Sequence, residues 1–324
     1  MSTSTDPAIA TAERDPASEL AAKRFVVAPY DVQVGPVGHL HRERARLADL
    51  EWEHFEARPM GATIGAELTG IRLSGDLSDE AIAELRAALL AYKAIFFRDQ
   101  TGLTAADHVA FARRFGELEI HPFIPANPDH PELVRFEKGA DVGGYENAWH
   151  ADVTWREVPS MGAVLHAISV PRTGGDTLFC DMHAVYEGLD ADLREQVRDL
   201  VAVHDFMQVF GHQVADEDKA AMREQYPTVE HPVVRTHPET GLPTLFVNRI
   251  FTSHIVGLEP DESTALIDRL CREADYPEYQ CRFQWTPDSV AFWDNRAVQH
   301  YAVSDYWPDV RIMERASIVG DRPR

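Results

Sequence analysis

The sequence is short of cysteine, of long apolar runs and of positive charge. Only three cysteines, Cys180, Cys271 and Cys281, occur in 324 residues, and no two of them form a C-x-x-C pair. An odd number of widely spaced cysteines argues against a disulfide framework or a cysteine-based zinc site. The pattern favours reduced thiols, so we expect a cytoplasmic protein.

The other two shortages limit the partners. No apolar stretch approaches the length of a membrane span, and residues 1–6 lack the basic start and apolar core of a signal peptide. Lysine and arginine number 31 against 53 acidic residues, a formal net charge of −22. This charge disfavours nucleic acid or an anionic membrane as a partner. We expect a small-molecule substrate and a homo-oligomer, dimer or tetramer. An anionic substrate would need a local cationic pocket.

The order of predicted elements indicates one main domain. Residues 1–57 form an N-terminal extension that begins with a polar, partly disordered tail, and residues 58–324 form the domain. Helices are predicted early, from Ser78 to about Lys93 and from Thr104 to Phe115. Short strands dominate from residue 160 onward, and residues 211–230 are a polar surface excursion or lid. The expected fold is mainly β with peripheral helices, a sandwich or jelly roll.

The first candidate site is the stretch Trp149-His150-Ala151-Asp152-Val153-Thr154-Trp155. Its aromatic and β-branched residues predict a strand, on which His150 and Asp152 would point to the same face. They would be two of the three ligands in a 2-His-1-carboxylate iron site. The alternative is a buried histidine bonded to a nearby aspartate. Four other His-x-acid pairs occur in charged or proline-containing surroundings, beginning at His41, His54, His130 and His237.

Two further motifs lie near the C-terminal end. His300 follows a predicted strand and could be the third ligand, although an ordinary core histidine is the alternative. On the predicted strand 311–319, Arg311 and Arg315 share one face about 13 Å apart. Arginine binds carboxylate or sulfonate oxygens with a planar fork, so the pair indicates two anion sites. The alternative is a solvated strand face with salt bridges.

Taken in order, these motifs resemble the taurine dioxygenase family of Fe(II)/2-oxoglutarate-dependent dioxygenases. The resemblance runs from about residue 58 to the C-terminal end. It rests on Trp149-His150-Ala151-Asp152-Val153-Thr154, Thr173-Gly174-Gly175-Asp176-Thr177-Leu178, His231-Pro232-Val233-Val234-Arg235-Thr236-His237-Pro238, Trp293-Asp294-Asn295-Arg296, Gln299-His300-Tyr301-Ala302, Arg311-Ile312-Met313 and Arg315-Ala316.

The resemblance implies a double-stranded β-helix, which is a cupin-like jelly roll. It implies His150, Asp152 and His300 as iron ligands, and Thr177 and Arg311 as the residues that bind the distal carboxylate of 2-oxoglutarate. The cofactors would be Fe(II), 2-oxoglutarate and O₂. Halogenases of related type lack the carboxylate ligand, so Asp152 favours hydroxylation.

The substrate site resembles that of the family only in part. His121, Phe210, Phe251 and Arg315 match its anion and apolar contacts, whereas Ile124 and Val209 replace a tyrosine and a serine. The loss of two hydroxyls predicts a larger or more apolar tail. We therefore expect an alkyl sulfonate or alkyl sulfate ester, hydroxylated with release of sulfite or sulfate and an aldehyde. The alternatives are a carboxylate substrate, such as an amino acid or biosynthetic intermediate, and a non-catalytic metal-binding jelly roll.

Overall fold

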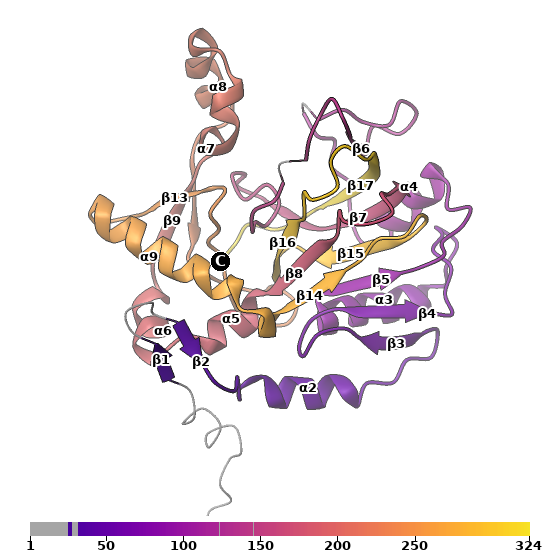
Figure 1. Cartoon of the computed structure of the whole chain (residues 1–324), viewed down its shortest axis with the longest axis horizontal. Helices are drawn as coiled ribbons and strands as arrows, with labels where there is room; N and C mark the ends of the chain where they lie inside the picture. Colours follow the sequence, from indigo (N-terminus) through magenta and orange to yellow (C-terminus); the bar gives the residue numbers. More distant parts are fainter. Residues whose placement is uncertain (1–24, 28–31, 123, 145) are drawn as a thin grey trace, which may run out of the picture.

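The computed structural model describes residues 25–27, 32–122, 124–144 and 146–324 (Figure 1). Its largest element is a seven-stranded sheet, antiparallel except for the pair β4–β5. The strands lie in the order β3 (Glu56–Pro59), β4 (Ala66–Thr69), β5 (Ala94–Phe97), β15 (Val290–Asp294), β7 (Ser160–Ser169), β17 (Arg311–Val319) and β6 (Leu133–Lys138).

The central strands of this sheet are apolar on both faces. Phe96 of β5 and Trp293 of β15 face a second sheet, whereas Ile95 and Phe292 face a layer of helices. A strand buried on both sides reads as a continuous apolar run, as Ala94–Phe97 does. The helices on the outer face are α3 (Asp79–Tyr92) and α4 (Ala105–Arg113).

A smaller antiparallel sheet completes the jelly roll. It contains β14 (Gln280–Phe283), β8 (Thr177–Asp181) and β16 (Val298–Ala302), in that order. Phe179 and Phe283 pack from this sheet against Phe96 of the large one, with ring centroids 5.4 and 4.4 Å away. Two facing sheets with helices outside confirm the predicted jelly roll, a double-stranded β-helix.

The other elements surround the open side of the two sheets. A three-stranded sheet contains β10 (Val229–Pro232), β9 (Val201–His204) and β13 (Thr252–Ile255), and β11 (Val234–Thr236) pairs with β12 (Pro243–Leu245). The helices α5 (Met182–Gly188), α6 (Ala191–Val197) and α9 (Pro260–Arg272) share one apolar core with this region. None of the helices in the described ranges is long and apolar enough to cross a bilayer.

Between β9 and β10 the chain makes an excursion away from the sheets. It contains α7 (Met207–Phe210), the 3-10 turns η1 (Gly211–Gln213) and η2 (Asp216–Asp218), and α8 (Lys219–Gln225). In Figure 1 this arm projects furthest at α8, and no residue of α8 is buried. The prediction of a surface excursion over residues 211–230 is confirmed, except that β10 begins at Val229.

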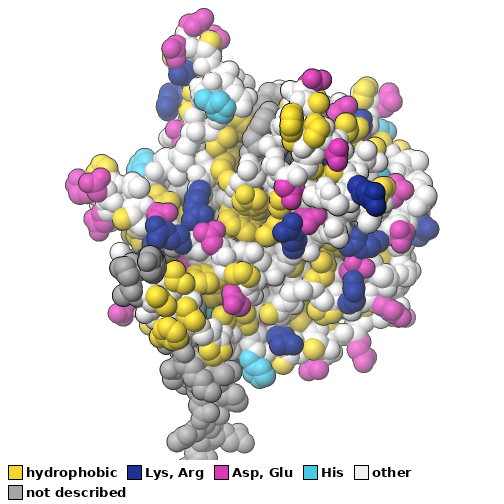
Figure 2. All heavy atoms as spheres, in the orientation of Figure 1, with side chains coloured by type: hydrophobic (Ala, Val, Ile, Leu, Met, Phe, Trp, Pro, Cys, Tyr) yellow, Lys and Arg dark blue, Asp and Glu magenta, His cyan; other side chains and the backbone are white. Residues whose placement is uncertain are grey.

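The described part of the N-terminal extension packs on the domain. It forms β1 (Phe25–Val27), β2 (Val32–Val34) and α2 (Leu40–Ala48). Glu43 of α2 lies 3.8 Å from the buried Lys93 ammonium, which also pairs with Asp181 at 3.1 Å. The predicted polar tail lies outside the described residues. Acidic and basic side chains are interspersed over the face shown in Figure 2.

The structure corrects three details of the predicted elements. The stretch from Trp149 to Trp155 is a bridge followed by a turn, not a strand. His300 follows β15, as predicted, but it lies on a further strand, β16, that was not predicted and that pairs with β8. The second predicted helix ends at Arg113, two residues before Phe115, while its predicted cap, Thr104, is confirmed by a reciprocal bond pair with Asp107.

Candidate active site

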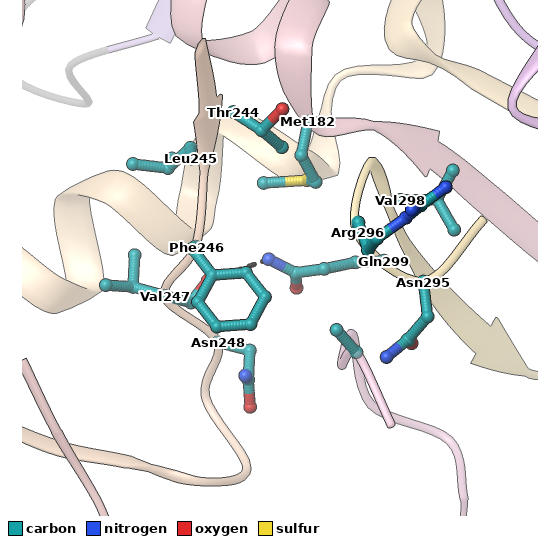
Figure 3. Close-up of a pocket in the computed structure, with 11 residues that line it drawn as sticks. Met182, Thr244, Leu245, Phe246, Val247, Asn248, Asn295, Arg296, Val298 and Gln299 are labelled. Atoms are coloured by element: carbon teal, nitrogen blue, oxygen red, sulfur yellow. Dashed lines mark hydrogen bonds between the residues drawn. The ribbon is translucent and has the colours of Figure 1, made fainter. Parts of the chain in front are cut away.

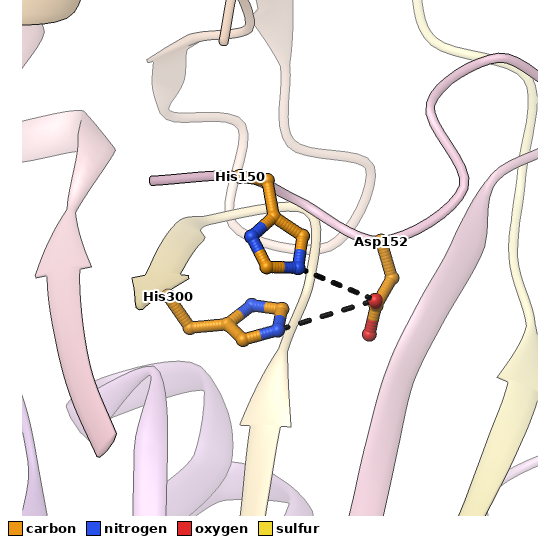
Figure 4. A group of neighbouring side chains, drawn as sticks. All are labelled: His150, Asp152 and His300. Atoms are coloured by element: carbon orange, nitrogen blue, oxygen red, sulfur yellow. Dashed lines mark ion pairs between the residues drawn. The ribbon is translucent and has the colours of Figure 1, made fainter. Parts of the chain in front are cut away.

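Two histidines and one aspartate meet at the open side of the jelly roll. His150 Nε2 lies 3.9 Å and His300 Nε2 lies 4.0 Å from the same oxygen of Asp152 (Figure 4). One ligand atom from each residue lies within 4.8 Å of the others, and this is the one such group of metal-binding side chains in the described parts of the chain. Imidazole and carboxylate donors at this spacing suit a divalent transition metal.

Backbone pairing positions the two histidines. The backbone groups of His150 and His300 exchange N–H to O hydrogen bonds of 3.1 and 2.8 Å, so the two rings lie side by side with centroids 4.3 Å apart. His150 Nδ1 donates to the Ala148 carbonyl at 2.8 Å, which fixes the tautomer and leaves Nε2 facing Asp152 as an acceptor. A histidine that donates through one nitrogen and ligates through the other is the usual arrangement at metal sites.

Asp152 reaches the group from a turn. Val153, the next residue, has a φ of 49°, which is unusual for a β-branched side chain. The prediction that His150 and Asp152 lie together is therefore confirmed, but the predicted strand is not the reason. Burial alone would raise the pKa of Asp152, but the charges of Arg315 and the two histidines outweigh it and lower the pKa to about 2. The carboxylate is ionised at neutral pH.

Arg311 is a buried cation at the start of β17. Its guanidinium carbon lies 5.8 Å from the ring centroid of Trp285 and 6.0 Å from that of Tyr306. Its Nε and Nη2 have no hydrogen-bond partner among the residues that the structure describes, and burial lowers its pKa. Trp285 also donates to Thr177 Oγ1 at 3.0 Å, so the two residues predicted to bind 2-oxoglutarate meet around one indole.

Arg315 lies on β17 four residues beyond Arg311, and its Nη1 is 2.9 and 3.0 Å from the two oxygens of Asp152. Both arginines are buried, so this part of the strand is not a solvated face, and the two anion sites stay a prediction. His121 Nδ1 accepts the N–H of Ile124 at 3.1 Å, so its proton is on Nε2. Burial, with the nearby Arg315 and Arg156 charges, lowers the pKa of His121 to about 4, and the ring is neutral at pH 7.

The predicted apolar contacts gather in a separate cluster around the excursion. Phe251 is buried there, with Val209 and Phe210 packed against it, and the cluster also contains Val153 and Trp155 from the Asp152 turn. The Phe210 and Phe251 ring centroids lie 6.3 Å apart. These apolar side chains thus begin directly beside the turn that carries the carboxylate.

A small cavity adjoins the residue before Asp152 (Figure 3). Ala151 lines it, together with residues of the β11–β12 hairpin and of the segment from Asn295 to Gln299. None of the eleven predicted site residues, all of which the structure describes, lines this cavity. Thr244 contributes a hydroxyl that has no hydrogen-bond partner in the described parts of the chain, which gives the cavity a polar wall.

Sequence reasoning missed three residues of this region. Trp285 and Tyr306 flank Arg311, and Asn295 bonds to the backbone of Asp152. Asn295 stands in a motif that carries the resemblance, but no role was assigned to it. No local pattern points to Trp285, because its partner Thr177 is distant in sequence.

A jelly roll with two histidines and one carboxylate on its open side defines the class of mononuclear non-haem iron enzymes. A sequence model of the taurine catabolism dioxygenase TauD, TfdA family matches residues 56–317. The chain belongs to this family. It is a 2-oxoglutarate-dependent dioxygenase, and its cofactors are Fe(II), 2-oxoglutarate and O₂.

Individual relatives are similar over most of their length. An alkylsulfatase of Acinetobacter baylyi is 34% identical over 277 residues, which is 83% of this chain and 86% of the relative. An alpha-ketoglutarate-dependent sulfate ester dioxygenase of Pseudomonas putida is 36% identical, covering 83% and 91%. The crystal structure of a taurine dioxygenase from Burkholderia xenovorans is 37% identical with a TM-score of 0.72, covering 84% and 91%.

Proposed function

We propose that His150, Asp152 and His300 hold the iron, and that Thr177 and Arg311 bind the distal carboxylate of 2-oxoglutarate. The donor set supports the first part, because two imidazole nitrogens and one ionised carboxylate oxygen converge. Three protein ligands leave coordination positions for a chelating 2-oxo acid and for O₂. When bound, the iron and 2-oxoglutarate together supply oxidation of a substrate C–H bond by O₂, with release of succinate and CO₂.

The observation that carries the proposal is the unpaired guanidinium of Arg311. A buried cation with two unpartnered nitrogens is costly, and a carboxylate relieves that cost by accepting one bond from each nitrogen. Trp285 holds the Thr177 hydroxyl oxygen as an acceptor, so the O–H is directed away from the indole and can donate to the same carboxylate. A non-catalytic metal-binding jelly roll would have no use for this buried cation.

Arg315 and His121 would bind the anionic head of the substrate. Arg315 supplies charge close to Asp152, and His121 supplies a neutral N–H donor from Nε2. The substrate head is thereby held near the iron ligands, and its tail extends toward the cluster that contains Phe210 and Phe251. These residues position the reacting carbon and exclude water from it.

The substrate class that fits best is an alkyl sulfate ester or alkyl sulfonate. Hydroxylation of the carbon that bears the sulfur group gives an unstable product. It collapses to an aldehyde, and sulfate or sulfite leaves with the electron pair of the broken bond. The names of the alkylsulfatase and sulfate ester dioxygenase relatives support this class. So do Ile124 and Val209, which bring two apolar side chains in place of the expected hydroxyls.

The second candidate is a carboxylate substrate. An (S)-phenoxypropionate/alpha-ketoglutarate dioxygenase of Sphingobium herbicidovorans is 37% identical over 283 residues, and Arg315 would bind a carboxylate as well as a sulfate. The head group alone therefore does not separate the two classes. The predicted homo-oligomeric state and cytoplasmic location remain predictions from the sequence.

The test is succinate formation from 2-oxoglutarate by the purified protein with Fe(II) under air. The panel contains taurine, alkyl sulfates and alkyl sulfonates of increasing chain length, phenoxy acids and amino acids. Stimulation by an alkyl sulfur compound with equimolar sulfate or sulfite supports the main proposal. Stimulation by a carboxylate alone, without sulfur release, supports the second candidate. A preference for taurine over longer alkyl compounds would contradict the apolar-tail argument.

A further inference from the structure

The turn that carries Asp152 is held in an unusual conformation. Val153 has a φ of 49° although its side chain is β-branched, and such a residue costs of order 1–3 kcal/mol of strain. The turn therefore persists only because neighbouring groups hold it. Those groups decide where the Asp152 carboxylate points.

The Asn295 side chain hydrogen-bonds to both the N–H and the carbonyl of Asp152. Its Oδ1 accepts the Asp152 N–H at 2.7 Å, and its Nδ2 donates to the Asp152 carbonyl at 3.0 Å. The second Nδ2 proton goes to the Ser160 carbonyl at 3.1 Å, and the Asn295 N–H donates to the Met161 carbonyl at 2.9 Å. Only 2% of Asn295 is exposed, so none of these bonds competes with bulk water.

Asn295 is itself fixed by the loop between β15 and β16. Its neighbours Asp294 and Arg296 form a buried ion pair of 2.7 Å, and His237 bonds to the same carboxylate at 2.9 Å. Asn295 thus links β7, through Ser160 and Met161, to the Asp152 turn. His300 lies on β16, directly after this loop, so one segment sets the position of two of the three proposed ligands.

Other side chains hold Thr154, the residue after Val153 in the turn. Thr154 Oγ1 bonds to His204 and Asn248 at 2.9 and 3.2 Å, and His231 donates to the Thr154 carbonyl at 2.9 Å. These bonds hold the residue after Val153. The backbone before Val153, where the carboxylate is attached, is held by Asn295.

We propose that Asn295 is a positioning residue for the carboxylate ligand, which acts on the metal through Asp152 without contacting the metal. This inference rests on the proposed role of Asp152. Partners that orient metal ligands commonly change metal affinity by 10–100-fold when they are replaced. An amide side chain suits this position, because its oxygen accepts one hydrogen bond and its Nδ2 group donates two.

The experiment is anaerobic titration of the intact protein with Fe(II), with the Kd as readout, together with thermal unfolding to show that each variant is folded. Asn295→Ser is expected to weaken Fe(II) binding 10–100-fold. The matched control is Asn127→Ser, because Asn127 also uses its amide in one donated and one accepted bond, to Glu314 and from Asp129. That control is expected to leave the Kd within about twofold, whatever its effect on Tm.

A double-mutant cycle separates positioning from a general effect on folding. In an Asp152→Ala background, Asn295→Ser is expected to have no further effect on the Kd, because the ligand it orients is absent. An unchanged Kd in Asn295→Ser, or the same loss in both backgrounds, would overturn the inference while leaving the proposed function intact. If Asp152→Ala itself binds Fe(II) normally, the proposed function fails and the inference fails with it. Asn295→Asp, which keeps the acceptor and the shape, replaces Asn295→Ser if the latter does not fold.

Discussion

Replacement of Arg311 by methionine is expected to have opposite effects on stability with and without 2-oxoglutarate. The Arg311 side chain is buried, and two of its nitrogens, Nε and Nη2, lack a hydrogen-bond partner among the described residues. Each unpaired buried donor costs about 1–3 kcal/mol. Methionine removes that cost and keeps an unbranched apolar stem between Trp285 and Tyr306. We expect the free energy of unfolding of the protein without 2-oxoglutarate to rise by about 1–2 kcal/mol.

With 2-oxoglutarate the order reverses. Loss of the charge-assisted bonds to the distal carboxylate, at about 1.5–3 kcal/mol each, weakens binding roughly 100-fold or more. At a concentration of 100 times the wild-type Kd, the ligand stabilises the wild-type protein by about 2.7 kcal/mol. At the same concentration a variant with a 100-fold weaker Kd gains only about 0.4 kcal/mol. The wild-type protein is then as stable as the variant or more stable.

The assay is denaturant unfolding under nitrogen with Fe(II), with and without 2-oxoglutarate. The control is Arg235→Met, because Arg235 is 1% exposed and its Nη2 donates to the Asp321 carboxylate at 2.9 Å. The Arg235→Met variant is expected to have a lower free energy of unfolding than the wild type, but to be stabilised by 2-oxoglutarate as much as the wild type is. If Arg311→Met were less stable without 2-oxoglutarate, or gained as much from it as the wild type, Arg311 would not be an unpaired cation awaiting a carboxylate.

Three further outcomes are expected. Burial lowers the pKa of His108 to about 3, so near pH 5 this imidazole is protonated in the unfolded chain but not in the folded protein. Acidification from pH 7 to 5 should therefore lower the free energy of unfolding by about 2 kcal/mol, and His108→Gln should not show this loss. Urea unfolding at both pH values measures the difference. Lys93→Met leaves the Asp181 carboxylate buried and unpaired, and should cost about 3–5 kcal/mol in the same assay, whereas Arg272→Ala, in an exposed pair, should cost under about 1 kcal/mol. Arg315→Lys loses the guanidinium fork and should raise the KM for the anionic substrate about 10–100-fold, with a smaller change in the KM for 2-oxoglutarate; equal changes in both would contradict the proposed division between Arg311 and Arg315.

The elements that the sequence predicted well are those with a strong local pattern. The strand Ala94–Phe97 is apolar throughout because both of its faces are covered, and Ser78 caps α3 by accepting the Ala81 N–H. The strand β6 was missed, because its charged residues follow no simple alternation. Arg135 of β6 is stabilised by an ion pair of 3.0 Å with Glu314 on the neighbouring strand, and the sequence does not reveal which strand that is.

The candidate site was predicted by motif resemblance more than by local structure. The reasoning from alternation placed His150 and Asp152 on one face of a strand, yet a turn at Val153 brings them together. A turn of this kind depends on Asn295, which lies far along the chain. In the same way, the Arg311 guanidinium lies near the rings of Trp285 and Tyr306, which come from other segments of the chain. Contacts between distant segments decide these features, and no window of local sequence contains them.

The strong negative charge of the chain does not prevent it from binding two anions in one site. Charges on the surface are screened over about 8 Å at physiological ionic strength. The cations that matter here are buried, with Arg311 and Arg315 each 8% exposed, so their attraction for a bound anion is screened far less. Arg315 already bonds to the Asp152 carboxylate, whereas the Nε and Nη2 of Arg311 bond to no carboxylate among the described residues. Under the proposed function, a free dicarboxylate therefore gains most at Arg311. The substrate anion would bind to the donors of Arg315 that Asp152 does not use, close to the proposed iron ligands.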